Sequence, residues 1–188
     1  MRLLLATRNP HKLREFERLL AGHELVAAPE EVALPPETGS TFEDNALAKA
    51  RAVALACAGP AIADDSGIEA QALGGAPGVR SARYAGPAAS DEDNLAKLLS
   101  EAPAGSGLAY VCALAFVDPG GDERVFVGRC NGRLAPAPRG DGGFGYDPAF
   151  LPDDGPAGLT MAQLSPTEKD AISHRGRAAR ALREWLGR

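Results

Sequence analysis

The chain has 188 residues, of which 45% are hydrophobic and 24% are charged. These proportions are those of an ordinary globular protein, so they argue against a mainly disordered chain, and the length suffices for a hydrophobic core without disulfides or structural metals. The 25 acidic residues outnumber the 20 basic ones by 5. This balance argues against a protein that coats nucleic acid, and any polyanionic ligand must be held by local positive charge or by a metal ion.

The cysteines and the hydrophobic runs indicate a soluble intracellular protein. Cys57, Cys112 and Cys130 are odd in number and widely spaced, which suits neither a disulfide framework nor a zinc site. The run at 3–6 is too short for the core of a signal peptide, and the run at 108–117 is too short to cross a bilayer. We therefore expect a single cytoplasmic domain over residues 1–188, with neither nucleic acid nor membrane as a partner.

The N-terminal part of the chain predicts alternating strands and helices, the order of an α/β protein. Residues 3–7 are a short hydrophobic run that is typical of a buried strand. A helix follows, with Asn9 as its N-cap and Pro10 at its first position. A short strand near Val26 leads into an exposed loop, and the spacing of a capping box predicts that the next helix begins near Ser40.

The middle of the chain predicts a second buried strand and a third helix. Residues 61–63 are hydrophobic, and we expect this strand to end at Asp64, where the sequence turns polar. The glycines and proline of 74–86 predict an ordered loop over the end of that strand. Ser90 is a suitable N-cap for the helix that follows, because acidic residues occupy its first turn.

The C-terminal part predicts a hairpin and further helices. Two hydrophobic runs, 108–117 and 124–130, flank a segment of turn residues, which predicts two antiparallel neighbours and hence a mixed sheet. Ser165 begins a second capping box, with proline at the first helical position. The chain then ends in an amphipathic helix that carries Leu182 and Trp185.

Four segments carry residue types that could support chemistry. The first is the turn of residues 7–12, between the first strand and the first helix, where backbone N–H groups and a helix dipole favour an anion. Lys12 adds a positive charge suited to phosphate. An ordinary capped helix with a solvated lysine would explain the same residues.

The second segment contains two adjacent carboxylates, Asp64 and Asp65, with Glu37 from an earlier loop as a possible partner. Adjacent carboxylates at the end of a strand repel each other, and a hard cation such as Mg2+ would compensate them and also bind phosphates. A solvated turn that uses Asp and Gly for backbone reasons is the alternative.

The third and fourth segments lie near the C-terminus. Phe144 and Tyr146 stand between glycines and a proline, so one of the rings could stack on a flat ligand such as a nucleobase, or both could simply plug into the core. Lys169, His174 and Arg175 form a donor-rich cluster for carbonyl or phosphate oxygens, although basic residues near a helix end are also common for structural reasons.

Taken together and in this order, these segments resemble the inosine triphosphate pyrophosphatase family, also called the Ham1 family. The matching segments cover nearly the whole chain: LATRNPHKLREF (5–16), ETGSTFEDNALAKA (37–50), AIADDSGIEAQALGGAPGVRSARYAG (61–86), GGFGYDPAF (142–150) and LSPTEKDAISHRGRA (164–178).

The resemblance implies an elongated α/β fold, in which helices flank a mixed sheet and two lobes surround a nucleotide-binding cleft, and it implies a homodimer. It also implies Mg2+-dependent hydrolysis of the triphosphates of inosine, deoxyinosine and xanthosine to the monophosphate and pyrophosphate. By this resemblance Asp65 is the general base and, with Glu37, a metal ligand. The implied substrate contacts are Thr7, Arg8, Asn9, Pro10, His11, Lys12, Ser66, Phe144, Gly145, Tyr146, Asp147, Lys169, His174 and Arg175.

Two other functions compete with this one. A Maf-like nucleotide pyrophosphatase, which acts on modified or pyrimidine triphosphates, would have different motifs in the base-binding loop from those of 144–147 and 173–175. A module that senses nucleotides without hydrolysing them would not need Asp65 beside a metal site. The sequence does not rank the inosine and xanthosine substrates, does not distinguish Mg2+ from Mn2+, and leaves open whether Asp64 is a metal ligand.

Overall fold

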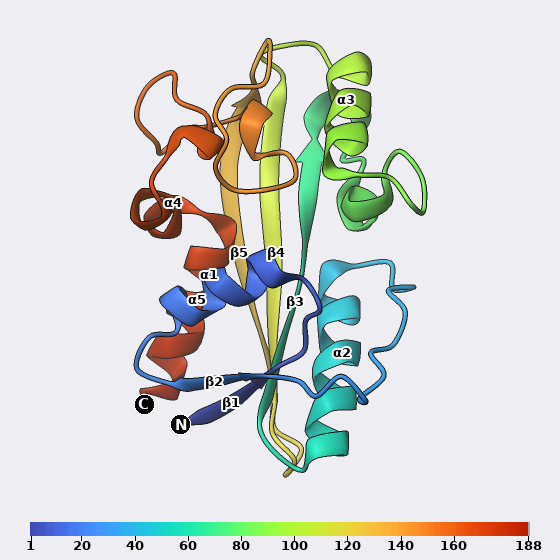
Figure 1. Cartoon of the computed structure of the whole chain (residues 1–188), viewed down its shortest axis with the longest axis vertical. Helices are drawn as coiled ribbons and strands as arrows, with labels where there is room; N and C mark the ends of the chain where they lie inside the picture. The colour runs from blue at the N-terminus through green and yellow to red at the C-terminus, as the bar shows by residue number, and fades with distance from the viewer. Residues whose placement is uncertain (188) are drawn as a thin grey trace. The chain divides into compact units, whose positions relative to one another are not determined.

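The computed structural model describes residues 1–187 and contains one six-stranded mixed sheet with helices beside it (Figure 1). The strand order is β2-β1-β3-β4-β5-β6. β1 runs parallel to β2 and to β3, whereas β5 and β6 are antiparallel, so the predicted mixed α/β fold is confirmed. The strands are β1 (Arg2–Leu5), β2 (Glu24–Ala27), β3 (Ala61–Ala70), β4 (Gly107–Val117), β5 (Glu123–Leu134) and β6 (Phe150–Pro152).

Five α-helices and several short 3-10 segments complete the described part of the chain. The helices are α1 (Pro10–Leu19), α2 (Phe42–Cys57), α3 (Asp91–Glu101), α4 (Pro166–Ile172) and α5 (His174–Leu186). None of the helices within residues 1–187 is both long and apolar enough to span a bilayer. The predicted ordered loop at 74–86 contains the 3-10 helix Gly78–Arg83.

Three helix starts agree with the capping residues expected from the sequence. Asn9 Oδ1 accepts hydrogen bonds from the backbone nitrogens of His11, at 2.8 Å, and of Lys12, at 3.3 Å. Ser90 and Ser165 each form a complete capping box with the acidic residue three positions later. Each such cap stabilises its helix by about 1 kcal/mol, because it satisfies backbone N–H groups that lack a partner within the helix.

The start of α2 lies one residue later than expected. Thr41, not Ser40, is the N-cap, and its hydroxyl accepts a hydrogen bond from the Asp44 nitrogen at 3.1 Å. The first helical residue, Phe42, is buried, and burial of this ring accounts for the register of the first turn. At the other end of α2, Ala58 adopts a left-handed conformation with φ of 47°.

The sequence-based prediction of where β3 ends was wrong. The strand does not end at Asp64 but continues to Ala70. Asp64 and Asp65 are only 1% and 4% exposed, because their carboxylates are held by partners from α1 and α2 rather than by water. The segment is therefore a buried strand, and both the solvated-turn explanation and the argument from a strand end fail.

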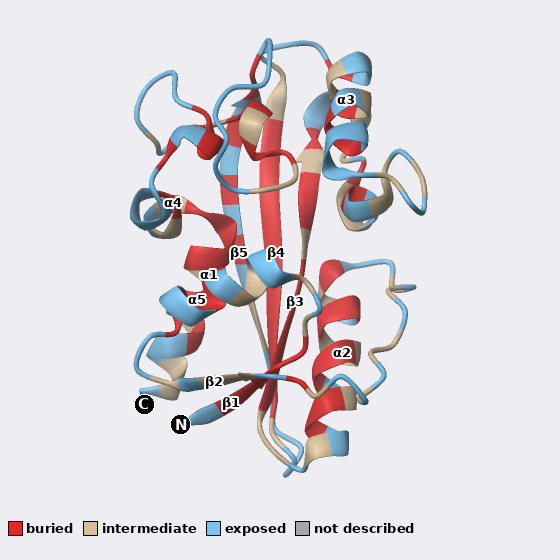
Figure 2. Cartoon of the chain, viewed as in Figure 1, coloured by how far each residue is buried: buried red, intermediate tan, exposed pale blue. Residues whose placement is uncertain are grey.

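The described chain forms two compact units, each with its own hydrophobic core. The first unit comprises Met1–Asp65, Cys112–Gly128 and the segment that starts at Arg177, and the second comprises Ser66–Val111 and Arg129–Gly176. Figure 2 shows that β4 is buried along almost its whole length. The first core includes Leu3, Phe16, Ile62, Leu114 and Leu182, and the second includes Ile68, Leu98, Tyr110, Leu134 and Phe150.

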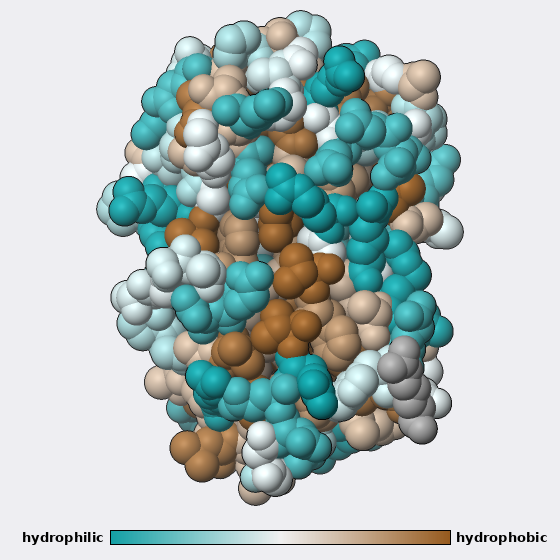
Figure 3. Space-filling view, turned by 180° about the vertical axis from the view of Figure 1, so that it is seen from behind, coloured by the Kyte–Doolittle hydropathy of each residue, from teal (hydrophilic) through white to brown (hydrophobic). Residues whose placement is uncertain are grey.

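The division into units bears on the predicted domain organisation. Both units are assembled from separate stretches of the chain, and a boundary falls between Asp65 and Ser66. A single domain over residues 1–188, the elongated form and the cleft stay predictions. On the face seen in Figure 3, hydrophobic side chains occur among hydrophilic ones. Within the described part, Leu55 of α2 is the most exposed large hydrophobic residue, followed by Met1 and by Val127 of β5.

Candidate active site

The turn of residues 7–12 lies in the first unit and ends in the capped start of α1. Lys12 is in the first turn of this helix, and its Nζ lies 2.9 Å from Oδ2 of Asp64. The Lys12 side chain is 14% exposed and that of Asp64 is fully buried. A helix N-terminus and a nearly buried ammonium group therefore occur together, which is the arrangement expected of a phosphate site.

Two other residues of this turn interact mainly with the protein itself. The Arg8 guanidinium donates to the carbonyl oxygens of Ala28, Pro29 and Val32 at 2.7, 2.8 and 2.7 Å. Arg8 thus holds the loop that follows β2. His11 Nδ1 lies 3.0 Å from an Arg14 nitrogen. Contacts of Arg8 and His11 with a substrate stay predictions.

Asp65 is held in place by Asn45 of α2. Asn45 Nδ2 donates to Asp65 Oδ2 at 2.8 Å, and Asn45 Oδ1 accepts from the Gly39 nitrogen at 2.8 Å. Burial raises the pKa of Asp65 and the charge of Glu37 raises it further, while Lys49, the Asn45 hydrogen bond and Lys12 act in the opposite direction. A carboxyl whose pKa is raised by burial and by a neighbouring carboxylate is typical of a group that exchanges protons.

Lys49 is a functional candidate that the sequence analysis missed. Its Nζ donates to Glu37 Oε1 at 2.5 Å and to the backbone oxygen of Asp64 at 2.7 Å. Burial lowers the pKa of Lys49, but the charges of Asp64 and Glu37 outweigh this effect and the net shift is upward. Asn45 and Lys49 are four residues apart on α2, so their polar side chains share one helix face; that spacing was a signal in the sequence.

The carboxylates of this unit suit a hard cation. Glu37 raises the pKa of Asp65 through its charge, so a cation between the two groups would relieve their repulsion. Carboxylate oxygens are the ligands that Mg2+ prefers, and this ion usually takes one or two protein carboxylates together with water and substrate phosphates. Within residues 1–187 no group of three or more His, Cys, Asp or Glu side chains is arranged to hold a metal. Glu37 and Asp65 fit a site that the substrate helps to complete.

The loop of residues 142–147 lies in the second unit and is organised by the Asp147 carboxylate. Asp147 Oδ2 accepts from Lys169 Nζ at 2.6 Å and from the Phe144 nitrogen at 3.0 Å, and Oδ1 accepts from the Tyr110 hydroxyl at 3.0 Å. Gly143 has a φ of +70°, and a Cβ there would lie 2.0 Å from Asp147 Oδ2. A glycine is therefore required at 143 for the carboxylate to approach the loop.

The two aromatic residues of this loop have different surroundings. Tyr146 is buried in the second core and its hydroxyl donates to the Ser81 oxygen at 2.7 Å. The core-plug explanation is thus correct for Tyr146, and its ring is not available for stacking on a base, because core packing occupies it. Phe144 is half-buried, and Lys169 Nζ and Arg175 Cζ lie 5.1 and 5.6 Å from its ring centroid.

The basic cluster near the C-terminus is buried rather than solvated. His174 and Arg175 begin α5 and are 4% and 2% exposed. Arg175 Nη2 donates to Ser66 Oγ at 2.8 Å. The His174 imidazole is stacked on the Tyr110 ring, with centroids 4.6 Å apart and planes inclined by 7°. Burying such donors is costly unless they are paired, so these side chains are held within the protein; the binding role and the alternative of basic residues near a helix end both stay predictions.

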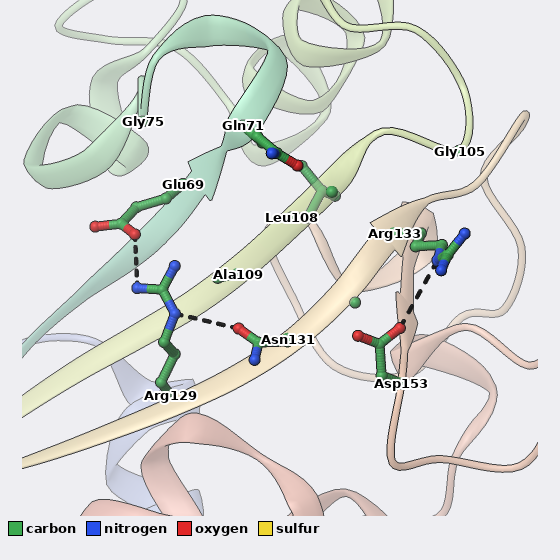
Figure 4. A pocket seen from close by; sticks show the side chains of 12 residues that line it. Glu69, Gln71, Gly75, Gly105, Leu108, Ala109, Arg129, Asn131, Arg133 and Asp153 are labelled. Carbon is green, nitrogen blue, oxygen red and sulfur yellow. Dashed lines mark hydrogen bonds and ion pairs between the residues drawn. The ribbon is translucent and has the colours of Figure 1, made fainter.

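A cavity of about 620 Å3 in the second unit has none of the predicted site residues in its lining (Figure 4). Its arginines are already paired, Arg129 with Glu69 at 2.8 Å and Arg133 with Asp153 at 4.0 Å. These pairs leave no excess of positive charge for a polyphosphate. The lining residues are Glu69, Gln71, Gly75, Gly105, Gly107, Leu108, Ala109, Arg129, Asn131, Gly132, Arg133 and Asp153, none of which was predicted to contact substrate.

The structure thus divides the predicted residues into two sets. Those assigned to phosphate and metal (7–12, Glu37 and Asp65) lie in the first unit, together with Lys49. Those assigned to the remainder of the nucleotide lie in the second unit: Ser66, Phe144, Gly145, Tyr146, Asp147, Lys169, His174 and Arg175.

Known proteins resemble this chain over almost its full length. A model of the Ham1 family matches residues 3–185. A protein of Frankia alni named dITP/XTP pyrophosphatase is 51% identical over 201 residues, which cover 99% of this chain and 97% of the relative. A protein of the same name from Cutibacterium acnes is 48% identical, with 96% and 94% covered. The solved structure of the Staphylococcus aureus Ham1 protein superposes with a TM-score of 0.87 at 38% identity, and covers 100% of this chain and 98% of that one.

Proposed function

The chain belongs to the Ham1 family, and on that premise we propose that it hydrolyses inosine, deoxyinosine and xanthosine triphosphates to the monophosphate and pyrophosphate, and so cleanses the nucleotide pool. The relatives named dITP/XTP pyrophosphatase support the substrate class. The observation that carries the proposal is the buried carboxyl of Asp65. Asn45 donates a hydrogen bond to it, and the charges of Lys49 and Lys12 act on it.

Two lysines would hold the triphosphate. A triphosphate carries about four negative charges near neutrality, and an acidic protein must meet them with positioned cations. Lys12 lies at the capped start of α1 and pairs with the Asp64 carboxylate. Lys49 donates to the Glu37 carboxylate and to the backbone oxygen of Asp64. Both ammonium groups are paired with protein oxygens, so they are already oriented when the phosphates arrive, and preorganised charge of this kind lowers the barrier to phosphoryl transfer.

Asp65 would act as the general base. Its carboxylate can accept the proton of a water molecule that attacks the α-phosphorus in line, and pyrophosphate leaves. A raised pKa makes Asp65 a better proton acceptor than an exposed aspartate would be. The hydrogen bond from Asn45 to Oδ2 fixes the orientation of this carboxylate.

We assign Glu37 and Asp65 as the ligands of Mg2+. When bound, the ion would neutralise phosphate charge and stabilise the leaving pyrophosphate. Nucleotide binding should therefore weaken when Mg2+ is replaced by EDTA, and it should weaken less in a Glu37→Gln variant, which has already lost one ligand. Titration of binding with Mg2+ and with Mn2+ would separate the two ions.

The second unit would recognise the base. Phe144 offers a half-buried ring for stacking, and Lys169, His174 and Arg175 offer nitrogen donors. Inosine and xanthosine share a carbonyl at purine position 6, which accepts such donors. We propose Ser66, Gly145 and Asp147 as the further contacts of this end of the nucleotide.

One assay tests this function against its competitors. Purified protein is incubated with the triphosphates of inosine, deoxyinosine, xanthosine, guanosine, adenosine and cytidine, and the released product is identified as pyrophosphate or orthophosphate by 31P NMR. We expect pyrophosphate from the first three. Preferred turnover of a pyrimidine triphosphate would favour the Maf-like function, and binding without turnover would favour a sensing module.

Two further parts of the proposal concern the state of the protein. We propose a homodimer, as the family resemblance implies; sedimentation equilibrium would test it, and a monomer at micromolar concentration would contradict it. We also propose that the enzyme works in the cytoplasm, where its triphosphate substrates are found.

A further inference from the structure

Tyr110 of β4 contacts two residues of the proposed base-recognition set at once. Its hydroxyl donates to Asp147 Oδ1 at 3.0 Å, and its ring is stacked on the His174 imidazole at a centroid distance of 4.6 Å. Tyr110 is 7% exposed and Asp147 is 2% exposed. In the sequence, Tyr110 lies within a hydrophobic run that predicts a strand, and no role follows from that pattern.

The hydroxyl and the ring of Tyr110 perform different physical tasks. The hydroxyl supplies a donor to one oxygen of Asp147, while Lys169 and the Phe144 nitrogen supply donors to the other. Burial, together with the charge of Asp147, raises the pKa of Tyr110 well above its usual value, so the phenol remains a donor at neutral pH. The ring lies nearly parallel to the imidazole, with an inclination of 7°, and limits rotation of His174.

We propose that Tyr110 is a positioning residue for base recognition, because its ring fixes the plane of the His174 imidazole and its hydroxyl fixes the Asp147 carboxylate that organises the loop of residues 142–147. This inference rests on the proposed function. It assigns selectivity between bases to the ring, through His174, and it assigns general nucleotide affinity to the hydroxyl, through Asp147 and Phe144.

Two substitutions separate the two tasks. Tyr110→Phe keeps the stack and removes the donor to Asp147, so KM should rise for inosine triphosphate and for ATP alike, by about 10-fold, as expected for a lost hydrogen bond to a charged group. Tyr110→Leu removes the stack as well. It should also lower the ratio of kcat/KM for inosine triphosphate to that for ATP, by at least ~10-fold, because a misplaced donor no longer distinguishes a carbonyl from an amino group.

Phe150→Leu is the matched control for loss of core packing. Phe150 is fully buried and its ring lies against Tyr110, with centroids 4.7 Å apart and an angle of 43°. The substitution removes an aromatic ring beside Tyr110 but leaves both the stack on His174 and the hydrogen bond to Asp147. The ratio of kcat/KM for inosine triphosphate to kcat/KM for ATP should therefore stay within about 2-fold of wild type, even where thermal stability falls as much as in Tyr110→Leu.

A spectroscopic readout tests the stack without any turnover. The chain has three histidines, so the imidazole signals of His174 can be assigned in a 1H–13C NMR spectrum by comparison with a His174→Ala variant. An aromatic ring stacked on the imidazole shifts its carbon-bound protons upfield. This shift should persist in Tyr110→Phe and disappear in Tyr110→Leu.

Each result either supports the inference or overturns it. The proposal is supported when Tyr110→Leu loses the upfield shift and has a lowered ratio of kcat/KM for inosine triphosphate to kcat/KM for ATP, while Phe150→Leu keeps the shift and the wild-type ratio. It is overturned when Tyr110→Leu keeps the wild-type ratio, when Phe150→Leu loses the ratio equally, or when the His174 signals of wild type and Tyr110→Leu coincide. If wild type itself hydrolyses no inosine triphosphate, the proposed function has failed first, and the role of Tyr110 in base selection fails with it.

Discussion

Asn45 connects Asp65 to the loop that carries Glu37: it donates to the Asp65 carboxylate and accepts from the Gly39 nitrogen, both at 2.8 Å. The side chain of Asn45 is buried, and a Cβ at Gly39 would lie 2.7 Å from its Oδ1. The loop therefore approaches α2 as closely as it does only because residue 39 is glycine. One asparagine thus holds Asp65 and the backbone two residues after Glu37, the two acidic residues to which we assign the base and the metal ligands.

Asp65→Asn should abolish turnover, and it should weaken nucleotide binding by no more than removal of Mg2+ does. The amide keeps the shape of the side chain, but it cannot accept a proton from water and is a poor metal ligand. Loss of a general base costs at least about 100-fold in kcat. Single-turnover kinetics with inosine triphosphate, and calorimetric binding of the same nucleotide, would measure the two effects separately. A variant with near-wild-type kcat would remove Asp65 from the catalytic role.

Lys12→Ala should raise KM more than it lowers kcat if the ammonium group holds the phosphates of the bound substrate. A fall in kcat as well would indicate that it also stabilises the leaving pyrophosphate. Lys97→Ala is a suitable control, because Lys97 donates to the Tyr84 oxygen in the second unit and has no assigned contact with substrate. Equal kinetics for Lys12→Ala and wild type would exclude the helix start as the phosphate site.

Lys49→Met should destabilise the fold by about 2 kcal/mol, because Glu37 and the Asp64 carbonyl lose a charged donor in a largely buried setting. Arg51→Ala on the same helix is the control. Arg51 pairs with Glu123 at the surface, and such exposed pairs contribute less than about 1 kcal/mol. Urea unfolding of both variants measures the difference; equal losses would show that Lys49 has no special structural role.

The contrast between these residues explains what the sequence could and could not predict. Caps such as Asn9 and Ser90 depend on residues two or three positions away, so local pattern was sufficient. The course of β3 through Asp64 and Asp65 depends on Lys12 and Asn45, which lie far away in the sequence. When those distant partners are not known, two adjacent aspartates indicate a turn. The sequence therefore predicted that the strand ends at Asp64.

The same reasoning applies to the base-binding loop. A Gly-Phe-Gly-Tyr segment does not reveal which ring faces the core, because Tyr146 is fixed by a hydrogen bond to the Ser81 oxygen, 65 residues away. The family resemblance assigned Phe144 and Tyr146 alike to contacts with the substrate. Their surroundings in the structure are different.

Tyr146→Phe should therefore leave kcat/KM for inosine triphosphate within about 2-fold of wild type, because the hydroxyl faces the protein interior. It should cost about 1 kcal/mol of stability, as expected for the loss of one hydrogen bond, and the unfolding midpoint in urea measures this cost. Phe144→Leu is the contrasting variant, and it should raise KM for every purine triphosphate because stacking is lost. A large kinetic effect of Tyr146→Phe with unchanged stability would show that Tyr146 contacts the nucleotide.

The last prediction concerns the choice of base. Hypoxanthine and xanthine carry an acceptor at position 6, where adenine carries an amino donor. His174 and Arg175 are both buried, so nitrogen donors from this pair would meet another donor in adenine and stay unpaired. Unpaired buried polar groups can give ~10,000-fold discrimination, far more than a hydrophobic pocket alone. Guanine shares the carbonyl at position 6, so its rejection requires a second protein donor that faces position 2, where it would donate to the carbonyl oxygen of xanthine and repel the amino group of guanine.

Truncation of either residue should therefore lower kcat/KM for inosine triphosphate much more than kcat/KM for ATP. The measurement is the ratio of these two constants for wild type, His174→Ala and Arg175→Ala. Arg180→Ala is the control, because Arg180 lies on the same helix but is exposed. Thermal unfolding of each variant identifies losses that come from the fold, since Arg175→Ala also removes the partner of Ser66 Oγ. If both activities fall together at a constant ratio, His174 and Arg175 hold phosphate or stabilise the fold, and the base is recognised by other residues.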